Sequence, residues 1–353
     1  MFNDGPVSVY DISNGFKLVE TFTLAGTNRG VRGVAVSPST HMMFVSYGGD
    51  GGSNGNGSVL AYDLLSKKIV WSVNLKTGID SGAVSADGKL LYMPDGELSS
   101  DGNWYILDTS NGNVVGKIET SGSGPHDGVM SADGRLLQLG NRNSSRLSIY
   151  NTQTHRLQAQ IGPLVGGVRP NTINGADSIS FTTATGVDGF QVSSITSPGS
   201  PVLYTESFGA CTGPFSTCSH GISLSPDEKK LYVIDTGFTD GPDNPSHIRV
   251  FDLNVEQGKV GNNKVFADMP KPSITDGVRC DTEGRVWCSV GWGDPNEDGV
   301  RCYTKDGELL GKIHIPETVA NLCFGGQQRN RLYICGSSSL YAVYTSAQGA
   351  MKP

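Results

Sequence analysis

Long apolar runs and clusters of basic charge are both missing from this chain. No stretch reaches the roughly 18 apolar residues that a membrane-spanning helix requires, so no membrane span is expected. The 27 Lys and Arg residues are scattered among 34 Asp and Glu, and the net charge is −7. A nucleic-acid partner would need a basic stripe, because phosphate contacts supply much of the affinity. These absences argue against both a membrane-embedded protein and a nucleic-acid partner.

The short motifs of several common enzyme classes are also missing. The sequence has no H-E-x-x-H, no P-loop and no C-x2-C pair, and nothing in it indicates a nucleotide or other organic cofactor. Cys211 and Cys218 flank the loop CTGPFSTC and can either close a small disulfide ring or stay reduced. The other five cysteines fall on apolar segments and are expected to behave as small buried hydrophobes: Cys280, Cys288, Cys302, Cys323 and Cys335.

Glycine is abundant, at 48 of 353 residues, and this suits many short strands joined by tight turns. A repeat of about 45 to 55 residues runs along the chain. Each copy combines a small-residue strand, a turn resembling S-x-D-G, a more apolar strand and two further strands. Clear copies start at Gly30, Gly78, Gly124, Ser219 and Ile274, and a degenerate copy starts at about Ile173.

The repeat predicts an all-β chain, a single β-propeller domain over residues 1–353. Seven blades are expected, with six as the alternative. The last copy, about 318–345, lacks its fourth strand, and the N-terminal strands in 6–24 are expected to complete that blade. Sharing a blade between the two ends of the chain removes open sheet edges. Two stacked β-sandwiches would explain neither the period nor the split terminal unit.

Polar side chains recur at the position of the repeat where each copy starts its innermost strand. In a propeller, this position is expected to lie at the mouth of the central channel. The set comprises Arg32, Asp80, His126 with Asp127, Asn174, His220, Asp276 and Asn321. His126, His220 and Asp276 are the catalytic candidates. Arg32, Asp80, Asn174, Asn321 and the loop residue Trp292 are the ligand-binding candidates. The turn residues Asp87, Asp133 and Asp227 instead have a structural explanation, since aspartate suits tight turns.

The ends of the second strands add Asp95, Asn141 and Asp235. His220 and Asp235 are expected to face the same mouth, where imidazole and carboxylate can bind a metal or orient a general base. The structural alternative is a hydrogen-bonded pair at the rim.

Two families resemble parts of this chain. HGISLSPDEKKLYVIDT and VRPNTINGADSISFTTATGVDGFQV resemble the YncE-like, YVTN-type seven-bladed propellers, many of which are exported. The last third of the chain is similar to the gluconolactonase family, the SMP-30/regucalcin-like proteins, in ITDGVRCDTEGRVWCSVGWG, GVRCYTKDGELLGKIHIPETVANLCFGG and RLYICGSSSLYAV.

The second resemblance implies a divalent cation at the channel mouth, where it polarises a lactone carbonyl. The family's metal-binding aspartate corresponds to Asp235, and one family asparagine corresponds to His220. The family's glutamate is replaced by Arg32, and the remaining asparagine is either Asn171 or Asn174. Calcium and a histidine-containing zinc site both stay open.

The favoured function is a metal-dependent hydrolase of a lactone, an ester or a related sugar-acid derivative. A non-catalytic YncE-like propeller that binds a small ligand or a protein is the alternative, and a histidine-dependent lyase or isomerase is the third. A monomer is expected. The YncE-like resemblance favours an exported protein with its leader removed, and a cytoplasmic location is the alternative.

Overall fold

The computed structural model describes residues 7–11, 17–24, 30–49, 51–52, 55–186, 188–209, 219–326 and 328–350. The chain divides into two compact units. Unit 1 comprises Met1–Pro6 and Phe22–Val168, and unit 2 comprises Val7–Thr21 and Arg169–Pro353. Cys211 and Cys218 lie outside the described residues. No helix within the described residues is both long and apolar enough to span a membrane.

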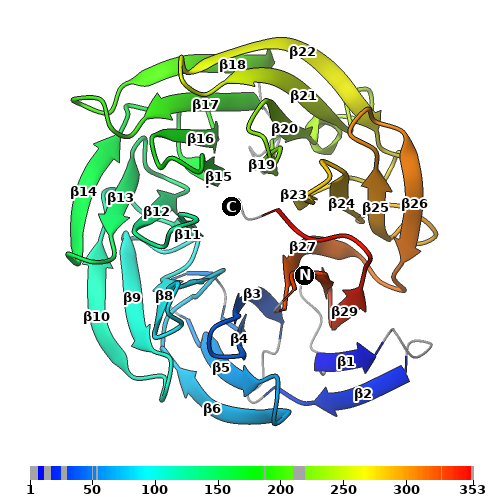
Figure 1. Cartoon of the computed structure of the whole chain (residues 1–353). Helices are drawn as coiled ribbons and strands as arrows, with labels where there is room; N and C mark the ends of the chain where they lie inside the picture. Colours follow the sequence, from blue (N-terminus) through cyan, green and yellow to red (C-terminus); the bar gives the residue numbers. More distant parts are fainter. Residues whose placement is uncertain are drawn as a thin grey trace. The chain divides into compact units, whose positions relative to one another are not determined.

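Unit 1 contains three four-stranded antiparallel sheets, each a blade whose strands follow chain order (Figure 1). The first is β3 (Val31–Ser37), β4 (Met42–Tyr47), β5 (Ser58–Asp63) and β6 (Lys68–Asn74). The second is β7 (Ala83–Val84), β8 (Leu90–Pro94), β9 (Asn103–Asp108) and β10 (Val114–Glu119). The third is β11 (Pro125–Met130), β12 (Leu136–Asn141), β13 (Leu147–Asn151) and β14 (Arg156–Ile161).

Unit 2 contains four further blades, three of them four-stranded. The first of these is β15 (Val168–Ile173), β16 (Ile179–Ala184), β17 (Asp188–Ser194) and β18 (Val202–Gly209). The second is β19 (Ile222–Leu224), β20 (Lys230–Asp235), β21 (His247–Asn254) and β22 (Lys259–Asp268). The third is β23 (Val278–Cys280), β24 (Val286–Val290), β25 (Gly299–Tyr303) and β26 (Leu309–His314). The last sheet has three strands, β27 (Val319–Gly325), β28 (Arg331–Gly336) and β29 (Leu340–Tyr344). The prediction of an all-β chain with seven propeller blades is confirmed.

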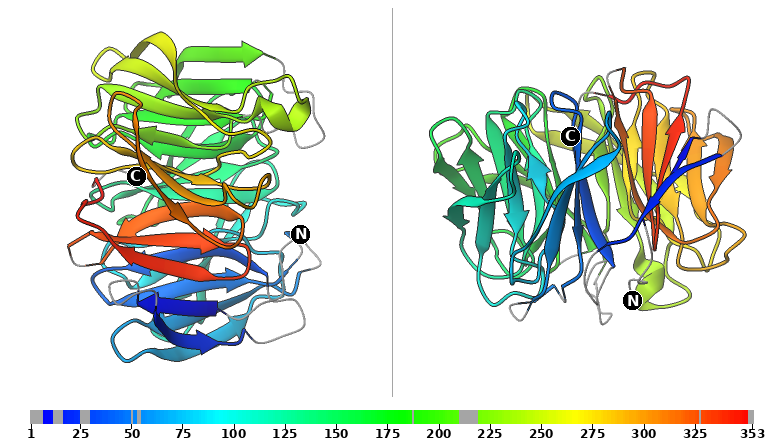
Figure 2. Two further views of the ribbon diagram at one scale, coloured as in Figure 1. Left: turned by 90° about the vertical axis from the view of Figure 1, so that its right-hand side faces the viewer. Right: turned by 90° about the horizontal axis from the view of Figure 1, so that it is seen from below.

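The N-terminal strands β1 (Val7–Asp11) and β2 (Lys17–Phe22) form a two-stranded sheet of their own. β1 lies alongside β29, as Figures 1 and 2 both show. A blade shared by the two ends of the chain requires this contact between β1 and β29. The assignment of residues 1–353 to a single domain stays a prediction.

The innermost strands are glycine-rich because they approach one another closely. A Cβ added at Gly33 would lie 2.6 Å from Cα of Ser81, and one added at Gly277 would lie 2.9 Å from Cα of Asn321. Any larger residue would push neighbouring strands apart. The small-residue pattern of the repeat therefore follows from the crowding of the inner strands.

The S-x-D-G-like turns share one hydrogen-bond pattern. Ser85 donates to Asp87 at 2.7 Å and Ser225 donates to Asp227 at 2.7 Å, and the residue that opens the next strand donates its N–H to the same serine. The serine hydroxyl lowers the pKa of both aspartates. The structural explanation predicted for these aspartates is confirmed.

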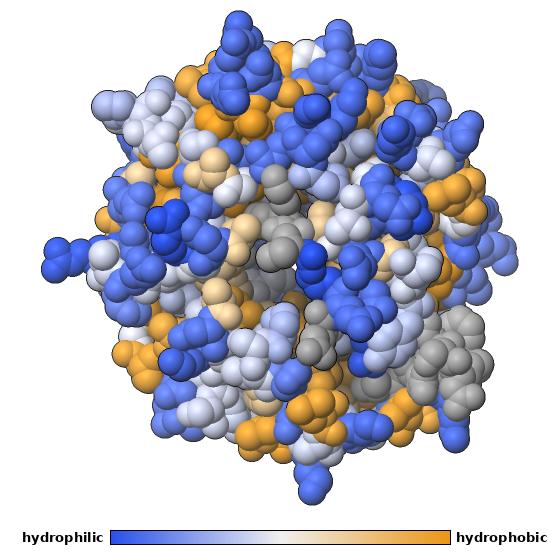
Figure 3. Space-filling model, in the orientation of Figure 1, coloured by the Kyte–Doolittle hydropathy of each residue, from blue (hydrophilic) through white to orange (hydrophobic). Residues whose placement is uncertain are grey.

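Apolar clusters between successive blades form the core. Phe44, Val59 and Leu91 belong to the cluster between the first two blades, and Trp104, Leu137 and Tyr150 belong to the next one. Exposed apolar side chains such as Leu65 and Leu310 are scattered among polar ones, as they are on the face shown in Figure 3. Cys280, Cys288 and Cys302 are buried free thiols, as predicted, while Cys323 and Cys335 are only partly buried.

We expect Trp104→Ala to lower the free energy of unfolding of the protein by about 3–5 kcal/mol, because it leaves a cavity in a fully buried position. The measurement is urea unfolding followed by circular dichroism. Trp292→Ala is the matched control: this tryptophan is 51% exposed, so its loss should cost less than about 1 kcal/mol. Equal losses in the two variants would contradict the assignment of Trp104 to the core.

Candidate functional site

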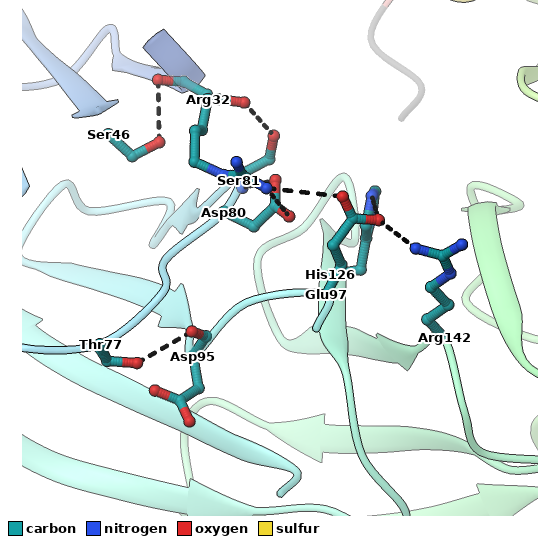
Figure 4. Close-up of polar contacts among 10 residues, drawn as sticks. Arg32, Ser46, Thr77, Asp80, Ser81, Asp95, Glu97, His126 and Arg142 are labelled. Carbon is teal, nitrogen blue, oxygen red and sulfur yellow. Dashed lines mark hydrogen bonds and ion pairs between the residues drawn. The ribbon is translucent and has the colours of Figure 1, made fainter. Parts of the chain in front are cut away.

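Five charged or titratable side chains converge in unit 1, and we call them the unit-1 cluster. They are Arg32, Asp80, Glu97, His126 and Arg142 (Figure 4). Arg32 is the second residue of β3, Asp80 precedes β7, and His126 is the second residue of β11. Glu97 lies in the connection between β8 and β9, and Arg142 directly follows β12. Three consecutive blades therefore contribute to one site.

Backbone contacts between two loops place Glu97 in this cluster. The N–H of Leu98 donates to the carbonyl of Gly51 at 2.7 Å, so the residues on either side of Glu97 lie against the β4–β5 loop. Gly96 has a φ of 123°, and a Cβ there would lie 2.3 Å from the same carbonyl oxygen. Only glycine tolerates this conformation at such a short distance. The close contact of Gly96 with Gly51 thus fixes where the backbone of Glu97 lies.

The cluster is a chain of ion pairs. Arg32 Nη2 lies 3.5 Å from Asp80 Oδ2 and 3.6 Å from Glu97 Oε1. The other oxygen of Glu97, Oε2, accepts from Arg142 Nη1 at 3.0 Å and lies 3.7 Å from His126 Nε2. The backbone N–H of Ser81 donates to Asp80 Oδ1 at 3.0 Å. Glu97 is therefore the centre of the cluster, because it contacts three of the other four residues.

The five side chains of the cluster differ in how deeply they are buried. The side chains of Arg32 and Asp80 are each 8% exposed, whereas those of Glu97, His126 and Arg142 are each between 21% and 23% exposed. Nδ1 of His126 is buried and has no hydrogen-bond partner among the described residues. Two carboxylates face two guanidinium groups, so the formal charges balance when His126 is neutral. The three outer residues are therefore partly open to solvent.

Asp80, Glu97 and His126 also form a group that could hold a metal ion. One ligand atom from each lies within 4.8 Å of the others, and the part of the chain that the structure describes contains one such group. Two carboxylates with an imidazole suit zinc or manganese better than calcium, which takes six to eight oxygen ligands. The donor types fit a divalent cation, but two guanidinium groups oppose it electrostatically. Arg32 lies 3.5 Å from an oxygen of Asp80 and 3.6 Å from one of Glu97, and Arg142 lies 3.0 Å from the other oxygen of Glu97.

The structure thus brings together three of the predicted residues, Arg32, Asp80 and His126, at the starts of three inner strands. Sequence reasoning missed Glu97 and Arg142. Both lie just beyond the end of the second strand of a blade, close to Asp95 and Asn141, which were selected because second strands end there. Including the next one or two residues of each loop would have found them.

Asp235 lies in a second polar group, in unit 2, and is fully buried. His247 Nε2 and Arg249 Nε each lie 3.0 Å from its Oδ2, and the N–H of Gly237 donates to its Oδ1. Burial alone would raise the pKa of Asp235, but these hydrogen bonds outweigh it and lower the pKa. A guanidinium group on this carboxylate is a poor companion for a metal ion. The donor set around Asp235 therefore does not fit the family's cation in this conformation.

His220, the predicted second ligand, is half-buried, and its Nδ1 lies 2.6 Å from the hydroxyl of Thr236. Neither His220 nor Asp235 belongs to a three-ligand group within the described residues. That His220 and Asp235 hold a metal stays a prediction.

Three further predicted site residues belong to unit 2. Asp276 is half-buried, and its N–H donates to Ser289 at 3.2 Å. Asn321 lies in β27, where its Oδ1 accepts from the N–H of Leu322 at 2.8 Å. Trp292 is exposed in the β24–β25 loop with a φ of 59°. Their catalytic or binding roles stay predictions.

Asn174 was wrongly placed at the start of an inner strand. It follows β15, and its Oδ1 accepts from the N–H groups of Ser178 and Ile179 at 2.9 and 2.8 Å. The N-G-A-D sequence after β15 is the turn of this blade, so the degenerate copy starts earlier than expected. Arg169 holds the position in β15 that Arg32 and His126 hold in their strands.

Comparisons with known proteins agree with the similarity seen in the last third. Residues 212–338 match the family model "SMP-30/Gluconolactonase/LRE-like region". Regucalcin of Gallus gallus is 28% identical over 125 residues, 34% of this chain and 38% of that protein. Gluconolactonase of Zymomonas mobilis is 28% identical over 139 residues, 37% of this chain and 35% of that protein. These matches span little more than a third of either relative.

Among solved structures, Kuenenia stuttgartiensis Hydrazine Synthase superposes with a TM-score of 0.67 at 16% identity, covering 92% of this chain and 98% of that one. At this identity the likeness concerns the fold alone. The gluconolactonase-like similarity predicted for the last third is therefore confirmed, and the YncE-like resemblance stays a prediction.

Asp188, which neighbours Asp235, should make stability depend on pH. Burial raises the pKa of Asp188 to about 7, and the charge of Asp235 adds to this rise. The folded state therefore holds this proton more tightly than the unfolded state, and stability falls as pH rises from about 4 to about 7, by at most about 1.4 kcal/mol per pH unit. We expect Asp188→Asn, which cannot ionise, to be more stable than the wild type at pH 8, in thermal unfolding.

Asp227→Asn is the control with the opposite sign. The pKa of Asp227 is lowered by its bond from Ser225, so its contribution to stability is present above about pH 4 and lost as pH falls below it. A difference between Asp188→Asn and wild type that does not change with pH would contradict the assignment.

Proposed function

We propose that this protein hydrolyses a small lactone or a related ester and that the unit-1 cluster is its reaction centre. One observation carries the location: three titratable side chains of ligand type and two guanidinium groups meet at the starts of inner strands, partly open to solvent. The substrate class rests on the similarity of residues 212–338 to a gluconolactonase-like region.

The chemistry of the cluster suits attack of water on a carbonyl carbon. His126 is placed to accept a proton from water, since imidazole is the side chain that most often serves as a general base. Arg142 and Arg32 donate hydrogen bonds toward the carbonyl oxygen, which gains negative charge as the new C–O bond forms. The ring C–O bond then breaks, and the alkoxide takes the proton from His126. Glu97 and Asp80 hold the two guanidinium groups and the imidazole in place.

A divalent cation on Asp80, Glu97 and His126 would supply polarisation of the carbonyl. Arg32 and Arg142 both weaken this site by repulsion, so metal affinity should be limited by these two residues. That the protein is a monomer remains part of this proposal, as does its export, which rests on the YncE-like segments.

Hydrolysis is measured as proton release from a panel of lactones and phenyl esters at constant pH. We expect His126→Ala to lower kcat/KM by about 100-fold or more, since a positioned general base typically contributes 10²–10⁴-fold. Glu119→Gln, an exposed carboxylate on β10, should leave activity unchanged. Full activity in His126→Ala would show that the unit-1 cluster is not the reaction centre. If the wild type hydrolyses no compound of the panel, the proposed hydrolase function is wrong.

Metal binding is measured by calorimetry with Zn²⁺ and with Mn²⁺ on protein treated with a chelator. Removing the positive charge in Arg32→Ala should tighten binding about tenfold, because a guanidinium group that contacts Asp80 and Glu97 no longer repels the cation. Asp80→Asn should weaken it. If both variants bind the metal like the wild type, the cation lies elsewhere.

One observation favours the second candidate function, a propeller that binds a ligand without transforming it. Both carboxylates of the metal-type group already contact arginine. Such a site recognises anions whether or not chemistry follows. Binding without turnover in the lactone panel would support it.

A further inference from the structure

Glu97 lies between two guanidinium groups that each contact a different oxygen of its carboxylate. Arg32 Nη2 faces Oε1 at 3.6 Å, and Arg142 Nη1 donates to Oε2 at 3.0 Å (Figure 4). We call Arg32 and Arg142 the arginine pair. Two guanidinium groups on the two oxygens of one carboxylate form an arrangement that would also recognise the carboxylate of a small molecule.

The contacts of Arg32 are long for an ion pair withdrawn from solvent. Its side chain is 8% exposed, and it lies 3.5 and 3.6 Å from its two carboxylate partners in this cluster. Charge-assisted hydrogen bonds between nitrogen and oxygen usually measure about 2.7–2.9 Å. A ligand carboxylate free to adjust its position can approach Arg32 more closely than the tethered side chains do.

Glu97 can leave the arginine pair without movement of its loop. Its backbone is held through the Leu98 N–H and the close contact of Gly96 with Gly51. Its side chain is 22% exposed and rotates about three bonds, so it can turn toward solvent. Displacing the Glu97 side chain then costs its contacts with the arginine pair, and an incoming carboxylate replaces these contacts.

We propose that the arginine pair is a carboxylate-binding site for which Glu97 competes as an internal ligand, and that the natural ligand is a small hydroxy acid. The identity of the ligand rests on the proposed function, because hydrolysis of a lactone adds water across the ring C–O bond and leaves a carboxylate and a hydroxyl on one molecule. Its carboxylate forms where the attacked carbonyl stood, beside the arginine pair.

The charge of the cluster favours a monoanion. With Glu97 turned away, Arg32, Arg142 and Asp80 leave one net positive charge, and a protonated His126 would add a second. A ligand with one carboxylate restores the balance that Glu97 provides, whereas an uncharged ligand leaves buried Arg32 without that compensation.

The test is calorimetric titration with glycolate, the smallest hydroxy acid, and with glycolamide as its uncharged counterpart. We expect the wild type to bind glycolate in preference to glycolamide. Glu97→Gln keeps the shape of the side chain but removes the competing charge, and it should bind glycolate about tenfold more tightly. Arg142→Ala should bind it about tenfold more weakly. Glu119→Gln and Arg156→Ala, both exposed on outer strands, are the matched controls.

The competition is the decisive feature. If Glu97→Gln binds glycolate with unchanged or reduced affinity while remaining folded, Glu97 is a structural partner of the arginines and the inference fails. Equal affinity for glycolate and glycolamide would also overturn it. Should Arg142→Ala unfold, Arg142→Lys keeps the charge and loses the second donor, and weaker binding is still expected. Lactone turnover is scored separately, so a missing hydrolase activity leaves these binding outcomes interpretable.

Discussion

The contact between Gly96 and Gly51 is the constraint on which the unit-1 cluster depends. Because neither residue has a side chain, two loops from neighbouring blades approach within hydrogen-bonding distance, and the Leu98 N–H joins them. Glu97 is thereby held over the starts of β3 and β11. Without it, Arg32 and Arg142 would lose the carboxylate that they share.

The unit-1 cluster also depends on the balance between its carboxylate and guanidinium charges. Each carboxylate contacts at least one guanidinium group, so the same residues that could bind a cation also oppose it. If the cluster binds ligands as proposed, affinity for a metal and affinity for an anion depend in opposite directions on the charges of Arg32 and Glu97. A charge removed from either residue shifts the cluster toward one kind of ligand.

Unit 2 carries the segment that resembles the gluconolactonase-like region, yet its aspartate has a different environment from a metal ligand. Asp235 is buried against Arg249 and His247, and Asp188 beside it holds its proton up to about pH 7. Arg249 also covers the ring of Phe208, with its guanidinium carbon 4.4 Å from the ring centroid. Through Arg249 and Phe208, these contacts join the blade formed by β15–β18 to the blade formed by β19–β22.

The sequence by itself determined the blades, because strand alternation, glycine-rich inner strands and S-x-D-G-like turns are local features that each copy repeats. It also placed Arg32, Asp80 and His126, since one phase of the repeat recurs at the starts of inner strands. It misplaced Asn174, because the turn of a degenerate copy was taken for a strand start. Only the tertiary structure decided that Glu97 and Arg142 complete the cluster and that Asp235 pairs with Arg249. The loop bearing Glu97 is positioned by a contact with a different blade, and the partners of a buried charge are set by packing across strands. Neither leaves a periodic signal in the sequence.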